Sequence, residues 1–208
     1  MISIVDYGLG NVQAFANIYK RLDLPCMIVK NAEELLQASR IILPGVGSFD
    51  WAIELLENSG MRKTLDEMVI NRAVPVLGVC VGMQIMAERS DEGKLPGLGW
   101  IKEAEVKRFD FSQELDNGHI RNRLPHMGWN DVKPTSFDTL FKNLTNPQFY
   151  FLHSYYFLPN IPQLVLAQSD YGIQFVSAIA QNNIMGVQFH PEKSHHWGVE
   201  LLRNFSEI

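Results

Sequence analysis

The sequence predicts a mixed α/β fold in which a mostly parallel central sheet is flanked by helices. In the first half, short apolar runs alternate with amphipathic segments, which is typical of parallel strands joined by helices. In the second half, short strand-like runs follow one another between Asn, Pro and Gly turns, which favours antiparallel pairing. No linker and no repeat interrupts the 208 residues. We therefore expect one domain over residues 1–208.

The first half supplies the strands of the parallel part. Each is a short apolar run, and the helices between them repeat apolar residues at three- or four-residue intervals. A short helix should also begin after Asn31, because Glu34 follows three residues later in a capping-box pattern. In chain order, strands are expected at residues 2–5, 26–29, 40–43 and 74–79, and longer helices at about 11–22, 49–58, 61–71 and 83–89.

The second half is expected to be mainly β-structure closed by a helix. Asn182 and Asn183 lie between two apolar runs, which is a hairpin signal. The last helix, at about 194–205, places Trp197 and Leu201 on one face, as packing onto a core requires. Strands are expected near residues 99–109, 128–133, 149–152, 164–167, 176–181 and 184–188.

Composition and charge exclude several classes of protein. A net charge of −5 and a pI near 5.7 argue against nucleic acid as the main partner, because phosphate binding needs clustered Lys and Arg. No segment is apolar for long enough to cross a bilayer, and the start resembles no targeting peptide. Two cysteines are too few for a disulfide framework. We therefore expect a reduced, cytoplasmic protein that binds neither nucleic acid nor membranes.

One of the two cysteines, Cys80, lies between Gly78 and Gly82, after an apolar strand and before an expected helix. This is the setting of a nucleophile elbow, in which small neighbours permit a sharp turn that exposes the side chain. The N-terminus of the helix would favour the thiolate over the thiol. The alternative is a buried structural cysteine, since free cysteines are among the most buried residues. The flanking glycines after a strand favour a nucleophilic Cys80, and a buried structural cysteine is the alternative.

A nucleophilic cysteine needs a base and a group that orients the base. His190 is the best candidate base, because it ends a strand-like run and Glu192 follows closely enough to orient the imidazole. The alternative is a surface histidine held by the turn at Pro191. His195 and His196 are adjacent, so they point apart on a helix and form no metal pair.

The glycine-rich stretch at residues 44–49 follows another expected strand. Such a turn can aim backbone N–H groups into the crevice at the strand ends, where a tetrahedral intermediate needs donors for its oxyanion. Glycine there is equally consistent with ordinary turn chemistry. Taken alone, the stretch is therefore a weak indication of an oxyanion site.

Three motifs in this order resemble those of the class I, triad-type glutamine amidotransferases. PGVGSF at 44–49 is similar to their oxyanion strand, GVCVGMQ at 78–84 to their nucleophile elbow, and GVQFHPEKS at 186–194 to their histidine–glutamate segment. The resemblance covers nearly the whole chain. It implies that Cys80 is the nucleophile, His190 the general base and acid, and Glu192 its orienting partner.

The same resemblance implies the substrate contacts and the products. The backbone of Gly45, Val46 and Gly47 would form the oxyanion hole, in the family after a peptide rearrangement. The α-amino and α-carboxylate groups of glutamine would be held by four further residues. Glutamate and ammonia would be the products, with no metal and no organic cofactor. The four residues are Gln84, Glu92, Ser154 and Tyr155.

Three further stretches, DYGLGN at 6–11, PHMGWN at 125–130 and FYFLHSYYF at 149–157, are similar to those of the glutaminase subunits of imidazole glycerol phosphate synthase. The resemblance implies a heterodimer with a HisF-type (β/α)8-barrel synthase that uses the ammonia in histidine biosynthesis. It also implies low activity without the partner's ligand. For Trp129 and Tyr150, the two aromatic residues of the implied interface, core packing is the alternative. The interface residues are Asn11, Trp129, Tyr150 and Lys193.

Three rival interpretations remain at this point. The stretches at 93–101 and 192–198 are less typical of histidine-pathway chains, which leaves room for a paralogous amidotransferase that supplies a synthase for a nitrogen-containing surface sugar. A thiol hydrolase or peptidase could use the same elbow, but it would not account for the glycine-rich stretch and the two histidine-containing stretches together. A binding module without activity is the third.

Overall fold

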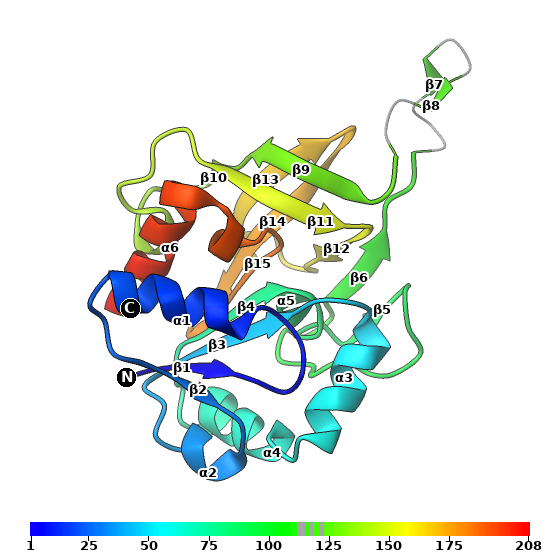
Figure 1. Cartoon of the computed structure of the whole chain (residues 1–208). Coiled ribbons are helices and arrows are strands. Elements are labelled where there is room, and N and C mark those ends of the chain that lie inside the picture. Colours follow the sequence, from blue (N-terminus) through cyan, green and yellow to red (C-terminus); the bar gives the residue numbers. More distant parts are fainter. Residues whose placement is uncertain (112–114, 117–118, 121–122) are drawn as a thin grey trace.

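The computed structural model describes residues 1–111, 115–116, 119–120 and 123–208. Its parallel part follows the order β2-β1-β3-β4-β15, in which each strand pairs in parallel with the next. Figure 1 shows these strands at the centre of the molecule. Their bounds are β1 (Ile2–Val5), β2 (Cys26–Val29), β3 (Arg40–Gly45), β4 (Val76–Cys80) and β15 (Ile184–Val187).

The sheet continues beyond β15 with mostly antiparallel strands. In order, the strands on this side are β14 (Ile173–Gln181), β12 (Tyr155–Leu158), β6 (Glu105–Arg108) and β5 (Arg89–Ser90). Two further strands extend the sheet from β14: β13 (Val165–Tyr171) pairs with β14, and β10 (Lys133–Pro134) pairs with β13. Separate two-stranded ribbons are formed by β9 (His126–Asp131) with β11 (Gln148–His153), and by β7 (Leu115–Asp116) with β8 (His119–Ile120).

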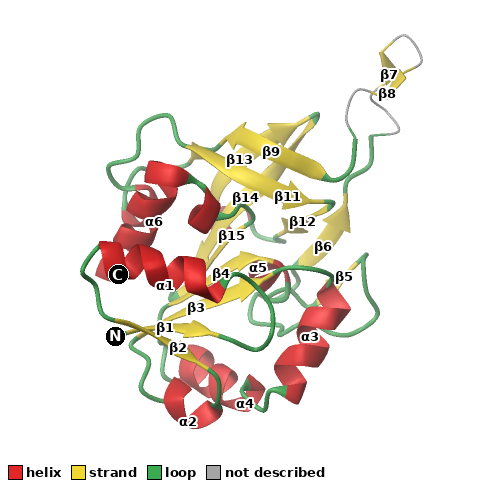
Figure 2. Cartoon of the chain, viewed as in Figure 1, coloured by secondary structure: helices red, strands yellow, loops and turns green. Residues whose placement is uncertain are grey.

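Helices cover both faces of the parallel part (Figure 2). α1 (Val12–Arg21) and α6 (His195–Glu207) contact each other on one face, and α2 (Ala32–Leu35), α3 (Phe49–Asn58) and α4 (Arg62–Asp66) lie on the other. α4 continues into a π-helical turn at Glu67–Asn71. Strands β1, β4 and β15 are buried along their whole length, as expected for parallel strands covered on two faces. The mixed α/β prediction is confirmed.

Most predicted elements lie within a few residues of the observed ones, but the helix expected at 83–89 is wrong. The observed α5 (Val81–Gln84) is a single turn. The helix does not continue, because backbone N–H groups from the loop at residues 98–99 donate hydrogen bonds to the carbonyl oxygens that follow α5. Leu98 donates to Ile85 at 2.7 Å and Gly99 to Ala87 at 3.1 Å, in place of the donors that a helix would supply.

The same loop shortens the strand expected at 99–109, which is observed only at β6. Two short 3₁₀ turns, Thr139–Phe141 and Pro162–Leu164, link strands in the second half. Strand β12 was not predicted. Within the described residues, no helix is long and apolar enough to span a membrane.

Candidate active site

Cys80 ends β4 and caps α5 in a strained backbone conformation, with φ +55° and ψ −114°. A positive φ is unfavourable for a residue with a side chain and persists only where the surroundings enforce it. Here the surroundings are tight: a Cβ on Gly82 would overlap the carbonyl oxygen of Leu43, and a Cβ on Gly78 would lie 2.6 Å from the carbonyl oxygen of Gly82. Both flanking glycines are therefore required by the turn.

The imidazole Nδ1 of His190 lies 2.8 Å from Oε1 of Glu192, and both side chains are only 3% exposed. The other carboxylate oxygen, Oε2, is buried and has no hydrogen-bond partner among the described residues. Burial alone lowers the pKa of His190, but hydrogen bonds with Cys80 and Glu192, together with their negative charges, raise it to about 10. The site therefore favours the imidazolium form of His190.

His190 is held by its backbone as well as by its side chain. Its N–H donates to the carbonyl of Tyr150 in β11 at 2.8 Å, and its own carbonyl accepts from Oγ of Ser194 at 2.6 Å. The same Ser194 Oγ accepts from the N–H of Tyr150 at 3.0 Å. The chain then forms a 3₁₀ turn at Pro191–Lys193 that brings Glu192 back to the imidazole. These bonds attach the histidine to the β9–β11 ribbon.

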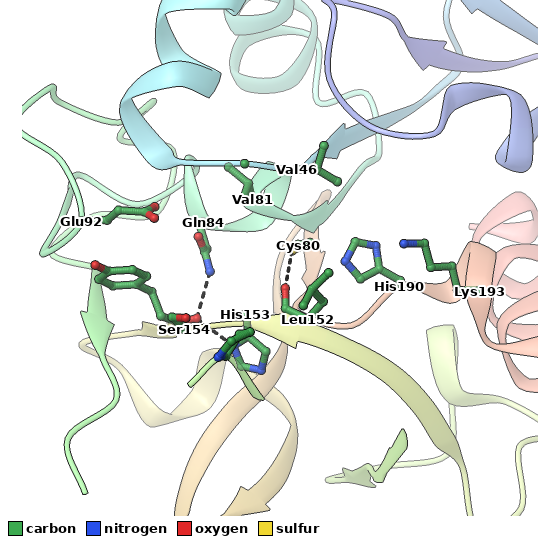
Figure 3. A pocket seen from close by; sticks show the side chains of 13 residues that line it. Val46, Cys80, Val81, Gln84, Glu92, Leu152, His153, Ser154, His190 and Lys193 are labelled. Atoms are coloured by element: carbon green, nitrogen blue, oxygen red, sulfur yellow. Dashed lines mark hydrogen bonds between the residues drawn. The ribbon is translucent and has the colours of Figure 1, made fainter. Parts of the chain in front are cut away.

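Cys80 and His190 open onto one cavity of about 250 Å³. This volume is below the range of about 300–1,000 Å³ found for drug-sized ligands, so the cavity suits a small substrate. Figure 3 shows Glu92 and Gln84 on one side of Cys80, and His190 and Lys193 on the other. The cavity is lined by Val46, Gly47, Cys80, Val81, Gln84, Glu92, Pro125, Leu152, His153, Ser154, Tyr155, His190 and Lys193.

The structure thus brings together most of the residues that the motifs single out. Gly45 and Glu192 do not line the cavity: Gly45 pairs with Cys80 across the β3–β4 register, and Glu192 lies behind His190. Among the described residues, no group of three or more His, Cys, Asp or Glu side chains could hold a metal ion.

The end of the cavity at Gln84 and Glu92 presents hydrogen-bond acceptors. The Gln84 amide nitrogen donates to the Tyr155 carbonyl and to Oε1 of Gln188, each at 3.0 Å, which leaves its own oxygen as the atom that can accept from a ligand. Oε2 of Glu92 accepts from the N–H of Phe49 at 2.8 Å. The pKa of Glu92 is raised, because burial outweighs the lowering effect of that N–H bond. This end suits a cationic group.

Two buried histidines support the neighbouring wall of the cavity. Nδ1 of His153 lies 2.8 Å from the carbonyl oxygen of Tyr155, so it must donate, and Nε2 must then accept from Nδ1 of His126 at 2.9 Å. Nε2 of His126 is left to accept from the Asn130 amide at 3.2 Å. Burial lowers the pKa of His153 to about 3 and that of His126 to about 4. Both rings are therefore neutral.

Sequence reasoning missed this histidine pair, although both residues lie within motifs that it quoted. No local signal links two histidines on different strands. They meet because β9 and β11 pair in a register that places His126 opposite His153. The pair fixes the backbone at Tyr155, which also accepts from Gln84.

Of the four residues considered for an interface, Lys193 lines the cavity. Trp129 and Tyr150 are directly opposite each other in the β9–β11 ribbon, and the ammonium of Lys193 lies 5.7 Å from the Tyr150 ring centroid. Trp129 is 45% exposed and stacks on His195, so core packing does not account for it. Asn11 caps α1, accepting from the N–H of residue 14 at 3.2 Å, and α1 contacts the Pro191–Lys193 turn.

Residues 3–207 match the family model described as "Glutamine amidotransferase class-I". The chain belongs to this family. Several curated relatives match over the whole length of both chains: the imidazole glycerol phosphate synthase subunit HisH of Bdellovibrio bacteriovorus is 54% identical and that of Leptospira borgpetersenii 50%. The subunit HisH 2 of Pseudomonas aeruginosa is 41% identical and also matches along the full length of both.

Solved structures of other proteins share the fold. A crystal structure of a glutamine amidotransferase superposes with a TM-score of 0.75 at 21% identity, covering 99% of this chain and 97% of the other. The structure of PurLQS from Thermotoga maritima gives a TM-score of 0.69 at 15% identity, with the same coverage. Membership of the amidotransferase family makes the chain an enzyme, so the interpretations as a peptidase and as an inactive binding module are set aside.

Proposed function

We propose that this amidotransferase is a glutaminase subunit, working as one domain, that hydrolyses glutamine to glutamate and ammonia and passes the ammonia to a partner synthase. The observation that carries the proposal is the buried His190–Glu192 pair beside Cys80, which is held on a strained elbow at the wall of a small cavity. The full-length relatives named HisH support the pathway, which is histidine biosynthesis.

In the proposed reaction, the Cys80 thiolate attacks the side-chain amide carbon of glutamine and forms a tetrahedral oxyanion. His190 then donates its proton to the departing ammonia as the C–N bond breaks, leaving a glutamyl thioester. His190, now neutral, takes a proton from water, and the resulting attack releases glutamate and regenerates Cys80. Glu192 orients the imidazole and stabilises its charge throughout.

The cavity supports a definite orientation of glutamine. Its α-ammonium would lie against the Glu92 carboxylate and the amide oxygen of Gln84, where acceptors gather. Its α-carboxylate would accept from the groups around Ser154 and Tyr155, which line the same end of the cavity. The side-chain amide would then reach Cys80, which lies between these residues and His190 in Figure 3.

The oxyanion would be bound by backbone N–H groups of Gly45, Val46 and Gly47, after a local peptide rearrangement. The position supports this, because Gly45 is opposite Cys80 in the sheet and Val46 and Gly47 line the cavity. Gly47 has φ +92°, a conformation in which glycine turns freely. Removal of one such donor from an oxyanion hole typically costs about 10²–10³ in kcat.

The proposed partner is a HisF-type (β/α)8-barrel synthase, docked on what we call the rim patch. This patch consists of Met127, Trp129, Tyr150, Leu152 and Lys193. Met127, Trp129 and Leu152 are 64%, 45% and 38% exposed, and large exposed apolar groups of this kind mark interaction surfaces. Leu152 also lines the cavity, so ammonia released at Cys80 would emerge beneath the docked partner. Asn11 would extend the contact. The cytoplasm is the proposed location.

The function is tested by assaying glutamine hydrolysis with the purified chain alone and with a HisF-type synthase and its nucleotide ligand. We expect slow hydrolysis alone and faster hydrolysis in the complex, and an unchanged rate would count against the proposal. Cys80→Ala should abolish hydrolysis. Cys26→Ala is the matched control, because this other cysteine lies on the edge strand β2.

A paralogous amidotransferase for a surface-sugar synthase is the second candidate, and relatives named HisH 2 are among the matches. Growth of a histidine auxotroph that lacks its own glutaminase subunit separates the two candidates. Rescue by this chain together with HisF supports the histidine pathway, and failure to rescue by an expressed, active chain supports the second candidate.

A further inference from the structure

Tyr7 lies in the loop that follows β1 and is buried, with 4% exposure. Its hydroxyl donates a hydrogen bond of 2.8 Å to the carbonyl oxygen of Pro44, near the end of β3. Neither the triad nor the substrate contacts described above use this residue. The bond joins the opening loop of the chain to the segment that would form the oxyanion hole.

The position of this bond in the sheet is informative. Paired residues of β1 and β3 end at Ile4 and Ile42, but β3 continues to Gly45. Over these last residues β3 lies beside the elbow, with Pro44 opposite Val79 and Gly45 opposite Cys80. Strand β1 itself ends at Val5. Tyr7 therefore holds a part of β3 that no longer pairs with β1.

A second contact from the same loop reaches the same proline. Gly10 has φ +87°, and a Cβ there would lie 2.6 Å from Cβ of Pro44 and 3.5 Å from the backbone nitrogen of Gly45. The loop thus contacts Pro44 at two points, through the Tyr7 hydroxyl and through the backbone of Gly10. On its other side, Gly45 packs tightly against the elbow backbone at Gly82. The end of β3 is clamped between the loop and the elbow.

The phenol of Tyr7 is suited to a permanent donor role. Burial raises its pKa, and negative charge on Cys80 raises it further. The hydroxyl therefore stays protonated whenever Cys80 is a thiolate. The phenol does not line the cavity.

We propose that Tyr7 is a positioning residue for the oxyanion strand: its hydroxyl bond to the Pro44 carbonyl, with the close contact at Gly10, sets where the following N–H groups lie relative to Cys80. This inference rests on the proposed glutaminase function. The physical reason is geometric, because a misplacement of about 1 Å in a catalytic group can cost about 10²-fold in rate. Tyr7 touches no reacting atom, so its effect should appear in turnover and not in substrate binding.

The test compares Tyr7→Phe with Tyr19→Phe in the full chain. Tyr19 is the matched control, because it too is buried and its hydroxyl also donates to a backbone carbonyl, that of Leu202, at 3.1 Å. We expect Tyr7→Phe to lower kcat for glutamine hydrolysis about tenfold, with KM within about twofold of wild type. Tyr19→Phe should leave kcat within about twofold. Equal kcat in Tyr7→Phe and wild type would overturn the inference.

A second measurement separates the oxyanion strand from the nucleophile. Methyl methanethiosulfonate reacts with a thiolate at sulfur: an S–S bond forms, methanesulfinate leaves, and no oxyanion arises at carbon. Its rate at Cys80, resolved from Cys26 by peptide mass spectrometry, should be the same in Tyr7→Phe and wild type. An equal loss of this reaction and of glutamine hydrolysis would overturn the inference, because the elbow itself would then be disturbed.

Replacement of Tyr7 by 4-aminophenylalanine supplies a rescue. The aniline keeps a donor at the para position, so kcat should return to within about threefold of wild type. A tenfold loss of kcat in this variant would overturn the inference, even if Tyr7→Phe fails to fold. A wild-type chain that hydrolyses no glutamine, alone or with its partner, would refute the proposed function itself. An active wild type with an equally active Tyr7→Phe would refute only the role of Tyr7.

Discussion

Glu192 holds His190 through a single buried contact, in which the imidazole Nδ1 and the carboxylate Oε1 are 2.8 Å apart. The second carboxylate oxygen has no other partner among the described residues, so the charge of Glu192 acts mainly on this ring. The carboxylate and Cys80 together raise the pKa of His190 to about 10, against the opposing effect of burial. The arrangement stabilises an imidazolium beside Cys80.

Glu192→Gln should lower kcat for glutamine hydrolysis by about 10²–10⁴, because the amide can no longer stabilise the imidazolium and can present a donor to the wrong nitrogen. The pKa of His190, followed by NMR titration, should fall. Glu200→Gln is the control, since Glu200 pairs with Arg203 on the surface of α6. A Glu192→Gln variant with wild-type kcat would exclude Glu192 as the orienting group.

The buried pair of His126 and His153 should make the protein acid-sensitive. Both folded-state pKa values, about 4 and about 3, lie below the unfolded value near 6.5, so the unfolded state binds more protons between these limits. Stability is therefore complete above pH 6.5 and decreases as the pH falls toward 4. At pH 5 the loss should be about 1–2 kcal/mol per histidine, measured by urea unfolding.

The matched variant for this prediction is His126→Gln, which carries no titrating group at that position. Its stability at pH 7.5 should be lower than that of the wild type, because the bond to His153 changes, but its further loss between pH 7.5 and 5 should be smaller. An equal loss in both proteins would show that the acid sensitivity comes from other groups.

Gly82→Ala should destroy the elbow. The added Cβ would overlap the backbone oxygen of Leu43, so the turn of α5 and strand β3 would have to move apart. We expect no detectable hydrolysis and a loss of about 2 kcal/mol or more in unfolding free energy, as is typical of overpacking in a core. Gly60→Ala is the control: Gly60 has φ +73°, which Gly82 does not share, but its added Cβ would enter open space. It should cost about 1 kcal/mol and leave kcat unchanged.

Trp129→Ala should weaken binding to the proposed barrel synthase about 10- to 100-fold, measured as Kd by calorimetry, because exposed aromatic groups often dominate an interface. The rim patch would lose its largest side chain. Ile70→Ala is the control, since Ile70 is similarly exposed, at 51%, but precedes β4 at the end of the sheet opposite Cys80. Equal weakening by both variants would place the interface elsewhere.

Several parts of the site could be predicted because they depend on neighbours in the chain. The His190–Glu192 contact spans two residues, and the glycines around Cys80 lie within the same turn. The capping interaction of Asn31 with the N–H of Glu34 is equally local. In each case the interacting groups are only a few residues apart in the chain, so short-range sterics and hydrogen bonding are enough to predict the contact.

Other parts could not be predicted, because they depend on how strands are ordered in space. The one-turn length of α5 is set by N–H groups from Leu98 and Gly99, which no local pattern in the helix indicates. The pairing of His126 with His153 follows from the register of β9 and β11. The phenol of Tyr7 reaches Pro44 only because β1 and β3 are adjacent.

The sequence by itself determined the α/β class, the elbow, the candidate base with its carboxylate, and the family. Only the tertiary structure decided that Cys80, His190 and the acceptors at Gln84 and Glu92 share one small cavity. The physical reason is that β4 and β15 pair in parallel, so their carboxyl ends, and the groups that follow them, meet at the same edge of the sheet. Strand order is a property of the packed core, which many distant side chains establish together.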